Sequence, residues 1–297
     1  MDDPQTQRNV DPPPRPGSWS AQGRPQYEFA GAWPFVLVHL LAFGAVFTGV
    51  TVTDVVVGVA LYWIRMFGVT GAYHRYFSHR SYKTSRWFQF VLAWLAMSSS
   101  QKGVLWWAAH HRHHHKYSDK INDVHSPARH GLFYAHVGWL FNNTEETDYS
   151  RVRDLARYPE LVLLNKYWVV PPALLGFAVW WWLGWSGLFI GFMASTAVLW
   201  HGTFTINSFT HLWGKRVYDT DDDSRNSMLF ALITMGEGWH NNHHYYQAST
   251  AQGWHWWQID MTYYVLKMLS WVGLVWDLRA VPPHVKNNNK VSELATS

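Results

Sequence analysis

The residues best suited to chemistry in this chain are histidines, and most of them occur in short clusters. The densest cluster is GEGWHNNHH at 236–244, and another, HHRHHHK, lies at 110–116. Imidazole is the commonest metal ligand in proteins, so histidines at this density indicate a metal site. A single cluster would fit an exposed polar helix face equally well. The interpretation therefore depends on whether the fold gathers several clusters.

The spacing within the clusters favours shared ligation. The pattern HxxHH occurs twice, as His111, His114 and His115 and as His240, His243 and His244. Positions i, i+3 and i+4 of a helix share one face, so each triplet can direct its imidazoles to a common point. Asn207 and His211 are four apart and share a face in the same way. His74 and His79 are five apart, which a regular helix separates by about 140°, so we expect the helix to break or bend between them.

Together these positions supply nine imidazoles, more than one metal ion can bind. Two metals with open coordination positions fit them better than a structural zinc site, which is closed by four ligands. Imidazole suits iron, copper, nickel and zinc alike, so the ligand type does not identify the metal. The chain contains no cysteine, which excludes disulfides and thiolate ligation. A redox di-metal centre that activates oxygen is the favoured interpretation.

Four long apolar segments are expected to position these clusters. They cover about 33–50, 54–73, 167–185 and 188–207. A hydrocarbon core of about 30 Å needs about 20 helical residues, so each segment is predicted to span the membrane, the first only narrowly. Short turns join them into two hairpins. The predicted fold is an all-α integral membrane protein with four transmembrane helices and a cytosolic helical cap that holds the di-metal site.

Positive charge falls on one side of this layout. Apart from Arg65, every Lys and Arg lies in the N-terminal arm, the 74–166 loop or the region after 207, and the two short turns contain none. Cytoplasmic loops carry such an excess, so both termini and every histidine cluster are predicted to be cytoplasmic. The alternative, a soluble helical protein with buried hairpins, fits the long charge-free segments poorly.

Outside the spans, composition defines the domain organisation. Residues 1–30 are polar and proline-rich, which predicts a disordered arm without the features of a signal or transit peptide. Residues 31–282 are expected to form one domain, followed by a tail at 283–297. The pI near 9.2 does not indicate nucleic-acid binding, because no basic helix or aromatic-interleaved basic strand is present. The basic residues fit a phospholipid surface instead.

Five motifs of the chain resemble those of a known family. HRYFSHRSYK, HHRHHHKYSD, HVGWL, NSFTH and GEGWHNNHH, in this order, are similar to the motifs of membrane-bound fatty acyl desaturases of the Δ9 (stearoyl) type. The resemblance covers about residues 35–280. Histidine boxes alone would also admit alkane hydroxylases and carotenoid oxygenases, and the last two motifs narrow the match to acyl desaturases. The C-terminal region resembles bacterial members, which implies a bacterial inner membrane.

The resemblance also implies a ligand set and a reaction. Nine histidines would bind two iron ions, and Asn207 would contribute through a water. The implied histidines are His74, His79, His111, His114, His115, His211, His240, His243 and His244. A register one residue earlier would use His110, His113 and His114 in the second box, but the lysine that follows His115 favours the first choice. With O2 as co-substrate, the implied product is a cis double bond, at Δ9, in a saturated acyl chain.

The partners implied by the resemblance are an acyl carrier and an electron donor. The carrier is coenzyme A, a membrane lipid or a carrier protein, and the sequence leaves this choice open. A fused cytochrome domain is not expected, so electrons should come from a separate ferredoxin or b-type cytochrome with its reductase. A hydroxylase on the same scaffold is the nearest alternative function. A non-catalytic metal carrier fits less well, since its ligands would line a path at membrane depth.

Further residues are expected to support the site. Tyr62 and Met66 lie 8 to 12 residues before His74, at the depth where the acyl chain should end, although both could simply face lipid. Metal-bound imidazoles usually donate their other N–H to an acceptor. The candidate acceptors are Glu237, Asn241, Asn242, Asp119 and Asp123. The acidic run at 219–223 is interpreted as a helix-capping loop, with docking of the electron donor as a weaker alternative.

Overall fold

The fold is described from a computed structural model, which defines residues 27, 32–142, 146–288 and 291. The predicted N-terminal arm, apart from Tyr27, lies outside these residues, as does most of the predicted tail. Within the described residues almost all regular structure is helical. The only sheet there is a two-stranded antiparallel pair, β1 (Lys83–Thr84) with β2 (Val275–Trp276).

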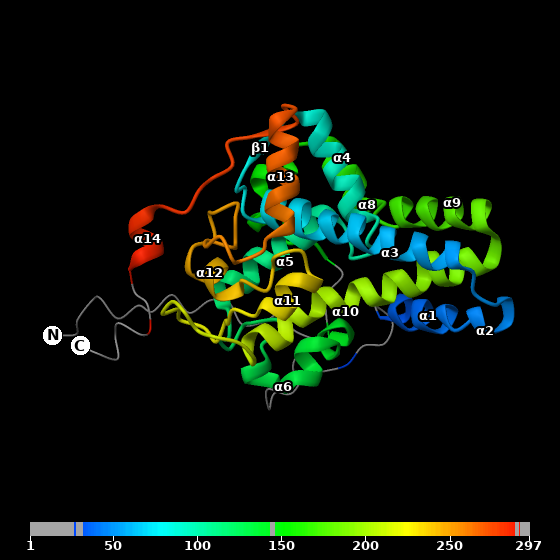
Figure 1. The fold of residues 1–297 in the computed structure, drawn as a ribbon, viewed down its shortest axis with the longest axis horizontal. Helices are drawn as coiled ribbons and strands as arrows, with labels where there is room; N and C mark the ends of the chain where they lie inside the picture. The colour runs from blue at the N-terminus through cyan, green and yellow to red at the C-terminus, as the bar shows by residue number, and fades with distance from the viewer. Residues whose placement is uncertain (1–26, 28–31, 143–145, 289–290, 292–297) are drawn as a thin grey trace.

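Four apolar helical segments lie side by side at one end of the molecule (Figure 1). The first pair consists of α1 (Trp33–Ala42) and α2 (Ala45–Thr48), followed by α3 (Val52–Phe67), which continues into the π-helix η3 (Gly68–Ser78). The second pair consists of α9 (Val170–Ser186), followed by η6 (Gly187–Ala194) and α10 (Ser195–Ser208). Each pair is a hairpin, as the sequence predicts.

Glycine and a capping box define the hairpin turns. Gly49 has φ +74° and Gly184 has φ +69°, a left-handed conformation that glycine adopts without steric cost. Thr51 then caps α3. Its hydroxyl accepts a hydrogen bond from the Asp54 backbone N–H, and the Asp54 carboxylate accepts one from the Thr51 N–H. The chain therefore reverses sharply at both turns.

Two of the helical stretches are long and apolar enough to cross a membrane, Val52–Ser78 and Val170–His211. The second stretch contains α9, η6 and α10, and the chain reverses its direction at Gly184. The segment expected as a first span at 33–50 is shorter, because Trp33–Thr48 is divided between α1 and α2 around Gly44. The four-span arrangement remains a prediction that these lengths do not establish.

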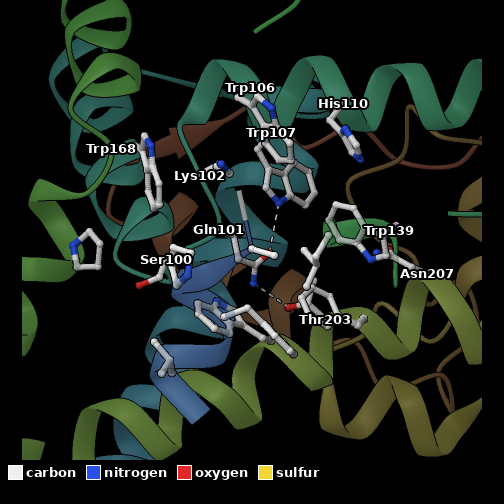
Figure 2. A pocket seen from close by; sticks show the side chains of 18 of the residues that line it. Ser100, Gln101, Lys102, Trp106, Trp107, His110, Trp139, Trp168, Thr203 and Asn207 are labelled. Carbon is white, nitrogen blue, oxygen red and sulfur yellow. Dashed lines mark hydrogen bonds between the residues drawn. The ribbon is translucent and has the colours of Figure 1, made fainter. Parts of the chain in front are cut away.

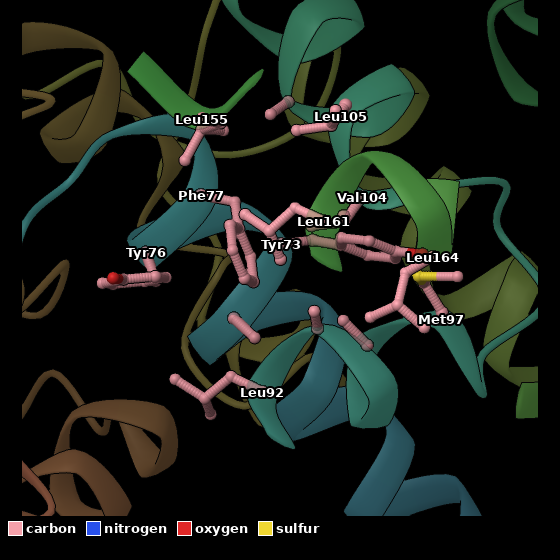
Figure 3. Packing of buried hydrophobic residues seen from close by; sticks show 14 of the residues in the cluster. Tyr73, Tyr76, Phe77, Leu92, Met97, Val104, Leu105, Leu155, Leu161 and Leu164 are labelled. Atoms are coloured by element: carbon pink, nitrogen blue, oxygen red, sulfur yellow. The ribbon is translucent and has the colours of Figure 1, made fainter. Parts of the chain in front are cut away.

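The histidine-bearing end of the molecule is built on a hydrophobic core of its own. It packs η3 against α4 (Arg86–Met97), α5 (Val104–Tyr117) and α8 (Pro159–Lys166), and Figure 3 shows Tyr73, Phe77, Leu105 and Leu161 at its centre. Their side chains are fully buried, so η3 and α5 are fixed rigidly relative to each other.

The remaining elements surround this core. They are α6 (Pro127–His136), η4 (Gly138–Asn142), η5 (Tyr149–Arg151), α7 (Arg153–Ala156), η7 (Phe209–His211), α11 (Met228–Ile233), α12 (His240–Tyr245), α13 (Met261–Trp271) and α14 (Pro283–Asn287). Helix α12 lies beside α5 (Figure 1), which brings the two HxxHH sequences together.

Candidate metal centre

Nine histidines from four separate stretches of the chain form two adjacent groups. The group of five contains His74, His79, His111, His115 and His243, and the group of four contains His114, His211, His240 and His244. Within each group, one ring nitrogen from every histidine lies within 4.8 Å of the others. The ring centroids of His115 and His244, one from each group, are 4.4 Å apart. The nine positions predicted from the sequence are therefore brought together.

Each HxxHH triplet is divided between the two groups, which differs from the common point expected from the sequence. On α5, His111 and His115 join the group of five while His114 joins the group of four. On α12 the division is reversed, since His243 alone joins the group of five. With about 100° per residue, positions i+3 and i+4 lie on opposite flanks of the shared face. Each helix thus straddles both groups.

The π-helix η3 explains how His74 and His79 reach the same group. The backbone N–H of His79 donates to the carbonyl of His74 at 3.2 Å, a hydrogen bond across five residues. A π-helix places residues five apart over one another, whereas an α-helix would splay them. The π-helix runs through His74 and ends at Ser78, with His79 as its C-cap. The wider π-helical turn is a feature that the five-residue spacing alone does not predict.

Four carboxylates each accept a hydrogen bond from the Nδ1 atom of one grouped histidine. The pairs are His74 with Glu237 at 2.5 Å, His114 with Asp123 at 2.9 Å, His211 with Asp119 at 2.7 Å and His244 with Asp222 at 2.5 Å. A metal-binding histidine is normally oriented by such an acceptor. Three of these acceptors, Glu237, Asp119 and Asp123, lie where the sequence predicts them.

A ring whose Nδ1 donates to a carboxylate can present the lone pair of its Nε2 atom to a metal ion. These Nε2 atoms face the interior of the groups. His74 Nε2 lies 3.0 Å from His243 Nε2, and His211 Nε2 lies 3.1 Å from its counterpart in His240. Converging nitrogen lone pairs repel one another unless a cation lies between them. The donor set therefore fits metal ions.

Burial keeps the remaining histidines neutral. Loss of solvent, reinforced by neighbouring imidazoles, holds the pKa values of His79, His115 and His243 well below their ordinary value. The carboxylates behave in the opposite way. Burial alone would raise the pKa of Asp119, but the hydrogen bond and charge of His211 outweigh it and lower that pKa to about 2. The centre thus combines several imidazoles of lowered pKa with carboxylates whose pKa is also lowered.

Glu237 is held in place by a buried ionic network. Arg75, which follows His74 in η3, donates to Glu237 at 3.0 Å and to Asp260 at 3.0 Å, and its side chain is 1% exposed. Gln252 also donates to Glu237, at 2.7 Å. Because these partners come from distant parts of the chain, they lock η3 onto the segment that carries α12.

The other predicted supporting residues have different roles. Asn241 accepts hydrogen bonds from the backbone N–H groups of Val217 and Tyr218. Asn242 donates to the Gln252 carbonyl and to Gln258. Neither amide has a described hydrogen bond to a histidine, so both brace the loops around α12. Asn207 lines cavities beside the histidines.

Asp222 is the acceptor that the sequence does not reveal. It lies in the acidic run at 219–223, which is interpreted there as a capping loop. Its Oδ1 does accept from Ser224 N at 3.1 Å, as such a loop would, while its Oδ2 accepts from His244. Burial would raise its pKa, but the charge and hydrogen bond of His244 lower it. Nothing in the spacing distinguishes Asp222 from its acidic neighbours.

An apolar cavity of about 350 Å³ reaches the centre. Figure 2 shows α5 with Trp106 and Trp107 on one side and Thr203 and Asn207 on the other. Gln101 spans the gap, since it accepts from Trp107 Nε1 at 3.3 Å and donates to Thr203 at 3.0 Å. The cavity wall includes His111, so it ends against the group of five.

A smaller cavity of about 40 Å³ continues from this point between the two groups. It is lined by His111, His240 and Met66. A Cβ atom added at Gly202 would lie 3.1 Å from Met66 Cε and 2.8 Å from the Tyr62 hydroxyl, so these two side chains pack directly on α10. Tyr62 also donates to the Ile233 carbonyl at 2.6 Å. Neither residue simply faces lipid.

Comparisons with known proteins agree on one family. A family model described as fatty acid desaturase matches residues 52–276. The sn-2 palmitoyl-lipid 9-desaturase of Nostoc sp. (strain 36) is 35% identical over 76% of this chain and 81% of its own length. The sn-1 stearoyl-lipid 9-desaturase of Anabaena variabilis is 33% identical over 86% and 95%. The acyl-CoA C20 Delta5-desaturase of Anemone leveillei is 35% identical over 76% and 73%.

Proposed function

The chain belongs to the fatty acid desaturase family, whose members are oxidoreductases, and on that premise we propose that it is an O2-dependent fatty acyl desaturase. It inserts a cis double bond at Δ9 of a saturated acyl chain at a centre of two iron ions. The observation that carries this proposal is that both histidine groups line a small cavity, which shares His111 with a larger apolar cavity. The names of two relatives, both 9-desaturases, support the Δ9 position.

The proposed iron ligands are the nine grouped histidines, with Asn207 contributing through a water. Their fit is supported by the inward-facing Nε2 atoms, whose partner nitrogens Nδ1 are fixed by carboxylates in four of the nine rings. Two bound irons would supply the activation of oxygen and the removal of hydrogen from unactivated methylenes. All further steps depend on how the chain places its substrate.

The cavity walls would place the acyl chain beside the histidine groups. Trp107 and His111 lie one helical turn apart on α5 and stack with ring centroids 4.9 Å apart, so the wall is continuous up to the ligands. Such a narrow apolar channel aligns neighbouring methylenes beside the centre and excludes water from it. Met66 lines the smaller cavity, and Tyr62 packs beside it against Gly202 of α10, which makes both the proposed limit on the length of chain beyond the new double bond.

The proposed setting is a multi-pass protein of the bacterial inner membrane. Its four apolar segments would span the bilayer, and both termini and the metal centre would lie in the cytoplasm, in agreement with the distribution of Lys and Arg. A separate ferredoxin, or a b-type cytochrome with its reductase, would supply the electrons.

Gas chromatography–mass spectrometry of fatty acids from an expressing host tests the function. The host should supply a ferredoxin and its reductase, and His240→Ala and His284→Ala serve as variants. We expect a new cis monoene with the wild type and with His284→Ala, because His284 is exposed on α14. His240→Ala should abolish the product. A hydroxy fatty acid, or an unchanged profile despite bound iron, would contradict the proposal.

A further inference from the structure

The relatives differ in the form in which they receive the acyl chain, since two are named for lipid substrates and one for acyl-CoA. The comparisons therefore do not select the carrier. The cavity that leads to the centre can distinguish these carriers, because the carrier must fit the place where the cavity opens. The inference below rests on the proposed desaturase function.

The cavity opens at two residues on membrane-type helices. Among the described residues that line it, only Trp33 and Val169 are exposed, at 61% and 52%. Trp33 is the first residue of α1, and Val169 is the N-cap of α9. The opening therefore lies beside the ends of two apolar segments, whereas the histidine groups lie at the opposite end of the cavity.

The surface that surrounds this opening is apolar. Val36 and Leu37 on α1 are 44% and 40% exposed, and Val170 and Leu174 on α9 are 38% and 52% exposed. Exposed apolar side chains at this density mark a surface that contacts lipid and not water. A molecule that enters here approaches sideways from the bilayer.

The polar groups at the opening suit the interface between lipid and water. Lys102 is the one Lys or Arg among the described lining residues, and its Nζ lies 5.4 Å from the ring centroid of Trp168 (Figure 2). Tryptophan and lysine are residues typical of the headgroup level of a membrane. The pair thus indicates the depth at which the opening lies.

Charge argues against a coenzyme A headgroup at this opening. Coenzyme A carries several phosphate charges, and proteins normally bind phosphate with multiple Arg and Lys side chains or with the free N–H groups of helix N-termini. The two helices that begin at this opening, α1 and α9, have proline in their first turns, which removes N–H donors there. One ammonium group, in a wall whose other polar side chains are hydroxyls, amides and imidazoles, does not meet that need. A glycerolipid requires less, because its ester and headgroup stay at the interface and only its acyl chain enters.

The segment that carries Lys102 is held in an unusual conformation. Ser100 and Lys102 have φ values of +60° and +71°, in the left-handed region that residues other than glycine seldom adopt. The Lys102 carbonyl accepts from the Tyr73 hydroxyl at 2.7 Å, and Gln101 bridges to α10 through Thr203. Backbone strain of this kind persists where the surroundings fix it, often at binding sites. It holds Lys102 at the opening and Gln101 across the cavity.

From these observations we infer that the acyl carrier is a membrane glycerolipid, whose acyl chain enters the cavity sideways from the bilayer past Trp33 and Val169. The ester stays at the level of Lys102, and the chain passes Gln101 and Trp107 to the histidine groups. The enzyme then acts on fatty acids already esterified in the membrane, so it remodels existing lipid.

A competition between two labelled acyl pools tests this inference. The iron-loaded full chain is reconstituted in vesicles of phosphatidylglycerol whose stearoyl ester carries heavy carbon, and deuterium-labelled stearoyl-coenzyme A is added in the aqueous phase. Chemical reduction followed by O2 allows a single turnover without a protein donor. We expect the monoene in the intact heavy-carbon lipid. A monoene in the deuterium pool would overturn the inference but leave desaturase function intact, and no monoene in either pool would overturn both.

A matched pair of variants tests the position of the opening. Val169→Trp narrows it, while Val170→Trp adds the same bulk at the next residue, which is 38% exposed but does not line the cavity. We expect turnover of the vesicle lipid to fall by about tenfold or more with Val169→Trp alone, at unchanged iron content, because entry is slowed without a change at the centre. Equal turnover by the two variants would overturn the proposed route.

Discussion

Substitution of Asp222 separates the metal-binding account from a purely structural one. Its Oδ2 accepts the Nδ1 hydrogen of His244 at 2.5 Å, and its side chain is 10% exposed. Asp222→Asn removes the negative charge that orients this ring and increases its basicity, with little change in volume. Asp221→Asn is the matched control, because the Asp221 side chain is 96% exposed and lies 4.0 Å from Lys120.

The magnitude follows from the role of such acceptors. Loss of a carboxylate that orients a metal-bound imidazole typically lowers metal affinity or activity by about 10- to 100-fold, or about 1.4 to 2.8 kcal/mol. Only the group of four contains His244. The loss should therefore affect one of two sites, so the variant should keep one iron tightly bound. Asp221→Asn should bind as the wild type does, because exposed ion pairs contribute little.

Anaerobic titration of the metal-free protein with Fe²⁺ measures both affinities, and elemental analysis after gel filtration counts the iron retained. Thermal unfolding of the metal-free variants serves as the control for folding. Asp222→Asn should unfold close to the control, since Ser224 and Thr220 can still hydrogen-bond to the amide oxygen that replaces Oδ1. Equal weakening by both substitutions, or two unchanged iron sites in Asp222→Asn, would refute the reasoning.

Three further predictions follow from the same contacts. First, burial lowers the pKa values of His79, His115 and His243, so the unfolded chain binds more protons than the native one below the ordinary histidine pKa. The Tm of the metal-free protein should therefore fall as pH drops below about 6.5, whereas bound iron should reduce this dependence; a flat Tm in both forms would contradict the protonation states. Second, Arg75→Gln leaves Glu237 and Asp260 buried without their cation and should cost about 3 to 5 kcal/mol in chemical unfolding, while Arg86→Gln, at the more exposed pair with Glu160, should cost much less. Third, Tyr62→Ala and Met66→Ala should shift the fatty acid products toward longer chains, and Ile64→Ala, on the exposed side of α3, should not; unchanged products from the first two would remove them as the end of the cavity.

The sequence predicts which residues gather at the metal centre, but it does not predict how they are arranged in space. The two HxxHH patterns and the hairpin layout follow from helical periodicity and hydropathy, which act locally. The division of each triplet between two groups does not, because it depends on where α5 and α12 lie relative to each other. The π-helix at 68–78 is equally hidden, since its sequence alone is compatible with an ordinary α-helix.

Supporting residues are predictable only where the chain brings them close to a histidine motif. Glu237 lies three residues before His240, and Asp119 and Asp123 follow His115 closely, so proximity in sequence suggests them. Asp222 lies 22 residues from His244 and is one of several acidic residues in a row. Asn241 and Asn242 are adjacent to ligands in sequence, yet their amides turn toward loops. Tertiary packing decides the direction in which each side chain points. That direction distinguishes the acceptors of the histidine rings from Asn241 and Asn242.

The central claim is that nine histidines form two iron sites, five ligands at one and four at the other. Its most direct test is the iron content of the purified protein, by elemental analysis and Mössbauer spectroscopy, beside His211→Ala, which removes a ligand from the group of four only. The account predicts two irons per chain in the wild type and one tightly bound iron in the variant. A single iron in the wild type, another metal in its place, or two irons retained by the variant would contradict it.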